Sequence, residues 1–185
     1  METYRPLQGK RVAILAADLY EDQELWYPYY RLQEAGADVT LVGPKADTTY
    51  TSKHGYPVTT DEAAAKVRAK DFDGIVIPGG YAPDKLRRYD AVLNLVKAIH
   101  DRGGMVAAIC HAGWVPISAG IMRGKIATGF YAIKDDLMNA GAEYVDEPVV
   151  VDGNLVTSRS PADLPQFLPA IIETLTGVEE AVPVE

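Results

Sequence analysis

The stretch Met105-Val-Ala-Ala-Ile-Cys-His-Ala-Gly113 joins an uninterrupted apolar run to a cysteine and a histidine. The run from Met105 to Ile109 has the composition of a strand that is covered on both faces of a sheet. Residues 112–120 then have a pattern typical of a helix. Cys110 is therefore predicted to lie at a sharp turn between a buried strand and a helix.

The rest of the chain alternates strands and helices in the same way. Strands are predicted at residues 11–17, 39–42 and 74–80, the last ending in a glycine loop, and a β-rich excursion at 50–59 and a hairpin at 149–157. Helices are predicted at residues 22–36, 61–70, 90–102 and 161–175. Such alternation favours a parallel sheet with helices on both faces. We therefore predict an α/β protein, a flavodoxin-like three-layer sandwich with a mostly parallel central sheet and a small β-hairpin.

Length and charge limit the classes of protein to consider. A chain of 185 residues suits one domain, which we predict to span residues 1–185, with a core at about 11–175 and a short acidic tail at 177–185. The net charge of -8 is unsuited to binding nucleic-acid phosphates. The sequence has no apolar run near the ~20 residues of a membrane helix and no apolar stretch typical of a signal peptide at its start. We expect a cytoplasmic protein that binds neither nucleic acid nor a membrane.

The lone cysteine is the main candidate for chemistry. A strand-to-helix turn pushes a side chain out of the sheet edge, and the amides and dipole of the following helix favour a thiolate. Cys110 therefore resembles the nucleophile of a hydrolase elbow, with an inert buried cysteine as the alternative. Two roles stay open for His111: it holds or deprotonates the thiol, or it pairs with a carboxylate from elsewhere.

Two other strand exits are expected to meet this turn. The amides of Gly79 and Gly80, with that of His111, are candidates for an oxyanion hole, the alternative being a plain flexible turn. Glu21 follows the first strand and is the candidate acid that donates a hydrogen bond to the thiol. Asp22 and Glu24 are interpreted as solvated charges at the start of a helix.

No metal or other cofactor is expected. The three histidines, His54, His100 and His111, lack ligand spacing, and one cysteine cannot form a cysteine-cluster zinc site. The glycine pair lacks the lysine of a phosphate-binding loop. The aromatic residues of the first helix, Trp26, Tyr27, Tyr29 and Tyr30, suit either an interface or the core.

Several motifs together resemble the DJ-1/PfpI superfamily, in its branch of PfpI-like intracellular proteases and deglycases with a class I glutamine amidotransferase-like fold. The motifs are Tyr20-Glu-Asp22, Lys53-His-Gly55, Pro78-Gly-Gly80, Ala108-Ile-Cys-His111, Lys134-Asp-Asp136 and Val150-Val-Asp-Gly-Asn154. The resemblance covers about residues 11–175. This sequence differs from the archaeal proteases of the family at two places. It has Ala112-Gly-Trp114 where those proteases have a Gly-Pro pattern, and Phe130-Tyr131 where they carry Tyr-Pro.

The resemblance implies the site and its assembly. Cys110 is then the nucleophile, Glu21 its hydrogen-bonding partner, and His111 is oriented by an acidic residue of a neighbouring subunit, at the position of Asp84 here. Family members usually carry glutamate at that position. A homo-oligomer, a dimer or larger, is therefore expected.

Three activities are compatible with such a thiol. The resemblance implies a glutathione-independent glyoxalase or deglycase that acts on methylglyoxal or on glycated protein, a cysteine peptidase, or a redox sensor or chaperone that uses oxidation of Cys110. A small aldehyde needs only a pocket and a proton shuttle, whereas a peptide needs a groove. We therefore favour a stress-protective enzyme in which Cys110 forms a hemithioacetal, the Gly79 and Gly80 amides hold the oxygen, and Glu21 or His111 moves protons.

Overall fold

The structure is a computed structural model that describes residues 5–177. The predicted acidic tail, apart from Gly177, lies outside the described residues. The strands are β1 (Arg11–Leu15), β2 (Asp38–Gly43), β3 (Thr49–Thr51), β4 (Pro57–Thr59), β5 (Glu62–Ala63), β6 (Gly74–Ile77), β7 (Met105–Ile109), β8 (Ile126–Ala127), β9 (Glu143–Tyr144), β10 (Val149–Asp152) and β11 (Leu155–Ser158). The α-helices are α1 (Asp22–Glu34), α2 (Ala82–Leu86), α3 (Asp90–Asp101), α4 (Trp114–Ser118), α5 (Lys134–Asn139) and α6 (Leu164–Thr176), with 3-10 turns η1 (Ala69–Asp71), η2 (Cys110–Gly113), η3 (Tyr131–Ile133) and η4 (Pro161–Asp163).

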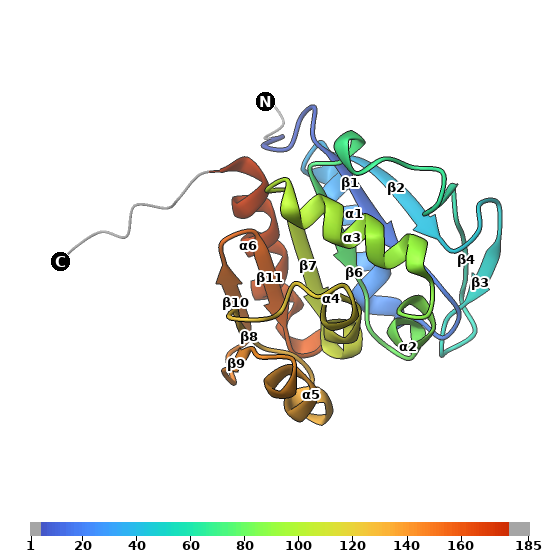
Figure 1. The fold of residues 1–185 in the computed structure, drawn as a ribbon. Helices are drawn as coiled ribbons and strands as arrows, with labels where there is room; N and C mark the ends of the chain where they lie inside the picture. Colours follow the sequence, from blue (N-terminus) through green and yellow to red (C-terminus); the bar gives the residue numbers. More distant parts are fainter. Residues whose placement is uncertain (1–4, 178–185) are drawn as a thin grey trace.

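A seven-stranded sheet forms the middle layer, in the order β10-β11-β7-β6-β1-β2-β5. All neighbouring strands are parallel except the β10–β11 hairpin at one edge. Helices α1 and α6 pack together on one face, and α3 and α4 lie on the other (Figure 1). The predicted flavodoxin-like three-layer sandwich is confirmed.

The central strands are held by apolar burial. Side chains of β1 from Val12 to Leu15 and all of β7 are at most 2% exposed. Such strands need cover on both faces, which the two helical layers supply. The carboxyl ends of β1, β6 and β7 consequently lie side by side, and the segments that follow them meet at one edge of the sheet.

One predicted helix is wrong. The sequence predicts a helix over residues 61–70 with Asp61 as the cap, but Asp61 Oδ2 accepts a hydrogen bond from the Leu41 amide at 2.8 Å. The next two residues pair with β2 as the short strand β5, and only η1 follows. Long-range pairing outweighs the local helix propensity of this segment.

The segment between α4 and β10 was not predicted. It contains the parallel pair β8 and β9 and the short helix α5. This excursion lies beside the end of β7, because the Phe130 amide donates to the Cys110 carbonyl oxygen at 3.1 Å. Within residues 5–177, no helix combines the length and apolar character needed to span a bilayer.

Candidate active site

Cys110 stands at the turn directly after β7. Its φ angle of 63° lies in the left-handed region, which residues other than glycine rarely adopt. Burial of Ala112 and Gly113 lets the next turn pack closely behind it. The predicted sharp turn is therefore present, although the chain enters it through the 3-10 turn η2 and then the short helix α4.

The carboxyl group next to the thiol belongs to Glu24. Its side chain is fully buried, and its Oε2 accepts a hydrogen bond from the Gly79 amide at 2.7 Å. Its other oxygen, Oε1, has no hydrogen-bond partner among the described residues. Glu24 and Cys110 both pack against Gly79, since a Cβ at Gly79 would lie 2.5 Å from Glu24 Oε2 and 2.7 Å from the Cys110 Cβ. The interpretation of Glu24 as a solvated charge is wrong. Glu24, Pro28 and Leu32 are spaced by four residues and share the buried face of α1, a signal in the sequence that pointed to this burial.

Burial couples the protonation of this carboxyl and the thiol. It raises the pKa of Glu24 to about 8. It also raises the pKa of the Cys110 thiol to about 12, with the negative charge of Glu24 adding to the rise. The net direction is therefore opposite to the thiolate expected at this turn, because burial outweighs the amides that lower the thiol pKa. A proton on Glu24 removes the opposing charge, so the protonated acid favours the thiolate.

Two backbone amides converge on the sulfur. The amides of Gly80 and His111 donate hydrogen bonds to Cys110 and lower its pKa. Gly79 was predicted to join them, but its amide donates to Glu24. The structure therefore brings together two of the three predicted oxyanion donors. Gly80 reaches this position with a φ of 76°, which glycine adopts without a steric penalty.

Glu21 lies nearby with another partner. Its Oε2 is 2.5 Å from Lys53 Nζ, and its side chain is only 9% exposed. The place predicted for Glu21 next to the thiol is occupied by Glu24 instead. Lys53 was not singled out for the site because it lies far along the chain, in the loop between β3 and β4. Its amide ties that loop to the Tyr20 carbonyl oxygen at 3.1 Å.

Lys53 supplies positive charge to the whole site. Its pKa is raised, first by the hydrogen bond to Glu21, so it stays protonated at neutral pH. Its charge lowers the pKa of Cys110, of Glu24 and of His111. The cation thus favours a thiolate and a neutral imidazole.

We expect Lys53→Met to slow alkylation of Cys110 by iodoacetamide. The partly screened attraction between the lysine charge and the thiolate contributes about 1 kcal/mol, so its loss corresponds to roughly a 5-fold lower alkylation rate at pH 7.5. Lys53→Arg is the matched control, because it keeps the charge, and it should react within about 2-fold of the native rate. Equal rates for the Met and native proteins would contradict this electrostatic role.

His111 contacts both the thiol and two aromatic rings. Its Nδ1 is 3.2 Å from Cys110 Sγ, so the adjacent side chains do meet. Its ring is stacked on Phe130 at a centroid distance of 4.8 Å and meets Trp114 edge to face at 5.2 Å. Burial, then the charge of Lys53, lowers its pKa. The imidazole is therefore neutral at neutral pH and can accept a proton.

Asp84 has a partner within its own chain. This half-exposed carboxylate on α2 forms an ion pair with Arg88 one turn later. Its predicted contact with His111 of a neighbouring subunit stays a prediction.

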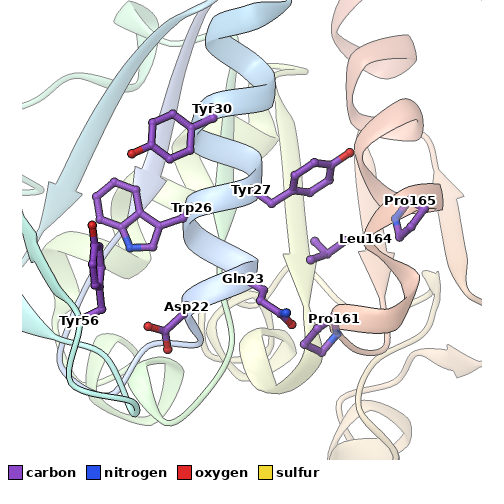
Figure 2. Close-up of a pocket in the computed structure, with 9 residues that line it drawn as sticks. All are labelled: Asp22, Gln23, Trp26, Tyr27, Tyr30, Tyr56, Pro161, Leu164 and Pro165. Carbon is purple, nitrogen blue, oxygen red and sulfur yellow. The ribbon is translucent and has the colours of Figure 1, made fainter.

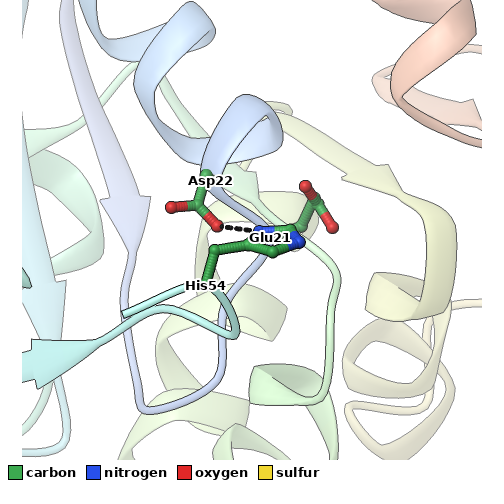
Figure 3. A group of neighbouring side chains, drawn as sticks. All are labelled: Glu21, Asp22 and His54. Atoms are coloured by element: carbon green, nitrogen blue, oxygen red, sulfur yellow. Dashed lines mark hydrogen bonds and ion pairs between the residues drawn. The ribbon is translucent and has the colours of Figure 1, made fainter. Parts of the chain in front are cut away.

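Glu21, Asp22 and His54 are the described side chains that are grouped closely enough to suggest a metal site (Figure 3). Their ligand atoms all lie within 4.8 Å of one another. Asp22, however, accepts one hydrogen bond from Ser52 Oγ and pairs with His54 at 2.7 Å, while Glu21 is bound by Lys53. Internal partners therefore satisfy these groups. The expectation of no metal cofactor stays a prediction.

A broad apolar groove lies apart from the thiol. Figure 2 shows Tyr27 on α1 facing Leu164 and Pro165 on α6, whereas Trp26 and Tyr30 project from the other side of the helix, on the side of Tyr56. Its volume is about 700 Å³, and neither Cys110 nor His111 lines it. The size of the groove therefore says nothing about the chemistry at the elbow.

Comparison with known proteins identifies the family. The family model described as the DJ-1/PfpI family matches residues 10–174. The chain belongs to the DJ-1/PfpI family. A Pyrococcus abyssi protein named a deglycase is 44% identical over 89% of this chain and 99% of its own. Bacillus subtilis YraA, named as a candidate cysteine protease, is 43% identical over 86% and 94%.

Solved structures of the family have the same fold. Drosophila melanogaster DJ-1beta superposes with a TM-score of 0.84 at 32% identity, covering 91% of each chain. A two-domain Anabaena variabilis protein with DJ-1/ThiJ/PfpI-like and ferritin-like domains superposes with a TM-score of 0.89 at 44% identity. That match covers 95% of this chain and 50% of the two-domain chain.

Proposed function

We propose that this DJ-1/PfpI family member converts small reactive aldehydes such as methylglyoxal to hydroxy acids through a Cys110 hemithioacetal. The observation that carries the proposal is the convergence of the Glu24 carboxyl, the His111 imidazole and two backbone amides on one thiol. Relatives named deglycases support this class of substrate.

The proposed reaction needs no external oxidant. The sulfur of Cys110 adds to the aldehyde carbon, and the thiol proton passes to the carbonyl oxygen, which forms the hemithioacetal. The hydrogen on that carbon then leaves as a proton while the neighbouring carbonyl oxygen is protonated, which gives an enediol. A proton then adds to the neighbouring carbon, and the hydroxyl on the sulfur-bearing carbon loses its own proton. The product is a thioester of lactate. Water hydrolyses this thioester to release lactate and restore the thiol.

Each neighbouring group suits one part of this sequence. His111 Nδ1, 3.2 Å from Sγ, accepts the thiol proton. The Gly80 and His111 amides, which donate toward the sulfur, are placed to stabilise an oxygen that becomes negative beside it. Glu24, with a pKa raised to about 8, is protonated at neutral pH and serves as the proton donor. Glu24 thus takes the role predicted for Glu21.

The test compares substrates on the native protein. We expect D-lactate from methylglyoxal without glutathione, and little or no cleavage of fluorescent casein by the same preparation. Casein cleavage without lactate would instead favour a peptidase, as the name of the Bacillus subtilis relative suggests. If the protein showed neither activity and mild peroxide oxidised Cys110 to a stable product, a redox sensor would be favoured.

We also propose that the protein is a cytoplasmic homo-oligomer. The exposed aromatic side chains of α1, Tyr27 at 42% and Tyr30 at 60%, support a protein interface on this helix. Asp84 has an ion-pair partner that a contact with a neighbouring His111 would have to replace. Light scattering should give at least twice the mass of the chain, and a monomeric mass would overturn the assembly.

A further inference from the structure

The excursion that contains β8 and β9 brings an aromatic residue onto the histidine of the elbow. Phe130 stacks on the His111 ring with planes 29° apart, and Trp114 meets the same ring edge to face, with planes 61° apart. We propose that Phe130 and Trp114 are positioning residues that fix the plane of His111 and so aim its Nδ1 at the thiol. This inference rests on the proposed function and concerns the same site.

Both rings are themselves anchored. The Phe130 amide donates a hydrogen bond to the Cys110 carbonyl oxygen at 3.1 Å, which holds the Phe130 backbone next to the turn at Cys110. The indole Nε1 of Trp114 donates to Asp136 Oδ2 at 2.7 Å, and the Arg87 guanidinium lies 5.6 Å from the indole ring. Rings that are anchored in this way restrict rotation of the imidazole that packs against them.

The hydrogen bonds of His111 do not by themselves fix the plane of its ring. Within residues 5–177, its ring has one hydrogen-bond partner, the Cys110 sulfur, and no carboxylate of the same chain orients it. A histidine without a carboxylate can still be held by the packing of other rings against its own. Burial, together with the charge of Lys53, lowers the pKa of His111, which keeps the imidazole neutral and able to take the thiol proton.

The test removes one ring and keeps the apolar character of the side chain. Phe130→Leu should lower kcat for lactate formation about 10-fold and leave KM within about 2-fold, since the histidine moves protons and does not bind the substrate. Phe130→Tyr, which restores the ring, should recover most of the activity. Tyr131→Leu is the matched control, because this neighbouring ring is 76% exposed, and it should behave like the native protein.

A second variant avoids the interior altogether. Asp136 is exposed, and Asp136→Asn weakens the anchor of the Trp114 indole without placing a new group at the site. We expect a smaller loss of kcat, about 2- to 3-fold, with unchanged thermal unfolding. A loss in Phe130→Leu that Phe130→Tyr does not rescue would overturn the positioning role.

Two readouts without aldehyde separate this inference from the proposed reaction. In NMR titrations, the His111 pKa should rise in Phe130→Leu and stay native in Tyr131→Leu. Alkylation of Cys110 should slow in Phe130→Leu alone. These results would support positioning even if the native protein made no lactate, whereas unchanged titration and alkylation in Phe130→Leu would refute it.

Discussion

Replacing Glu24 with glutamine should make the stability of the protein much less sensitive to a rise in pH from 5 to 8. The Glu24 carboxyl is fully buried, and burial raises its pKa from an ordinary value of 4.5 to about 8. The folded state therefore holds its proton more tightly than the unfolded chain. The stabilisation is complete below pH 4.5 and is lost as the pH rises toward 8.

The size of this effect follows from linkage. Each pH unit between the two pKa values costs ~1.4 kcal/mol, so roughly three units cost about 4 kcal/mol, a large part of the stability of a typical domain. Glutamine cannot ionise and removes this slope. Urea unfolding at several pH values measures it, with Glu34→Gln, an exposed carboxylate on the same helix, as the control. If the free energy of unfolding changed with pH equally in the native protein and in Glu24→Gln, the result would contradict the conclusion that Glu24 is buried and protonated.

Gly80→Ala should destabilise the protein strongly and abolish most activity. A Cβ at Gly80 would lie 2.5 Å from the Leu19 carbonyl oxygen and 2.6 Å from the Glu21 amide nitrogen. Both are backbone atoms in the segment that bridges to Gly80, so no side-chain rotation relieves the clash. The residue must also keep a φ of 76°. We expect a loss of about 3–5 kcal/mol from overpacking and backbone strain together.

Gly120 offers a matched control for this substitution. It has almost the same φ, 75°, but no heavy atom lies within 4 Å of the position that a Cβ would take. Gly120→Ala therefore measures the backbone cost alone, about 1–2 kcal/mol, without loss of activity. In Gly80→Ala the shifted amide should lower kcat by about 100- to 1,000-fold in molecules that still fold. Equal unfolding free energies and activities for the two variants would show that the close approach at Gly80 is unimportant.

The fold follows from the sequence where single segments carry enough information. The apolar run from Met105 to Ile109 can only be buried, and a cysteine between such a strand and a helical pattern lies at a turn. The parallel order of β1, β6 and β7 then brings Gly80 and Cys110 together. The prediction of a helix over residues 61–70 is wrong because the Asp61 side chain accepts a hydrogen bond from the Leu41 amide of β2, and this long-range contact outweighs local helix propensity.

The electrostatics of the site could not be predicted so directly. Two acids three residues apart at the start of α1 have different surroundings, since Glu24 points inward and Glu21 binds Lys53. That lysine is 32 residues away from Glu21 in the chain, and only the β3–β4 loop brings the two together. The rings around His111 were likewise hidden in an excursion whose strands are only two residues long.

The most direct test of the account is D-lactate formation from methylglyoxal, without glutathione, by the native protein and its Cys110→Ser variant. Both proteins should first be shown to be folded, and the native thiol to be reduced and reactive. We predict lactate from the native protein and a rate lower by about 1,000-fold or more from Cys110→Ser, because a serine hydroxyl is a far weaker nucleophile without a strong base. Equal lactate formation by the two proteins would contradict the proposed chemistry at Cys110, as would its absence from the native protein.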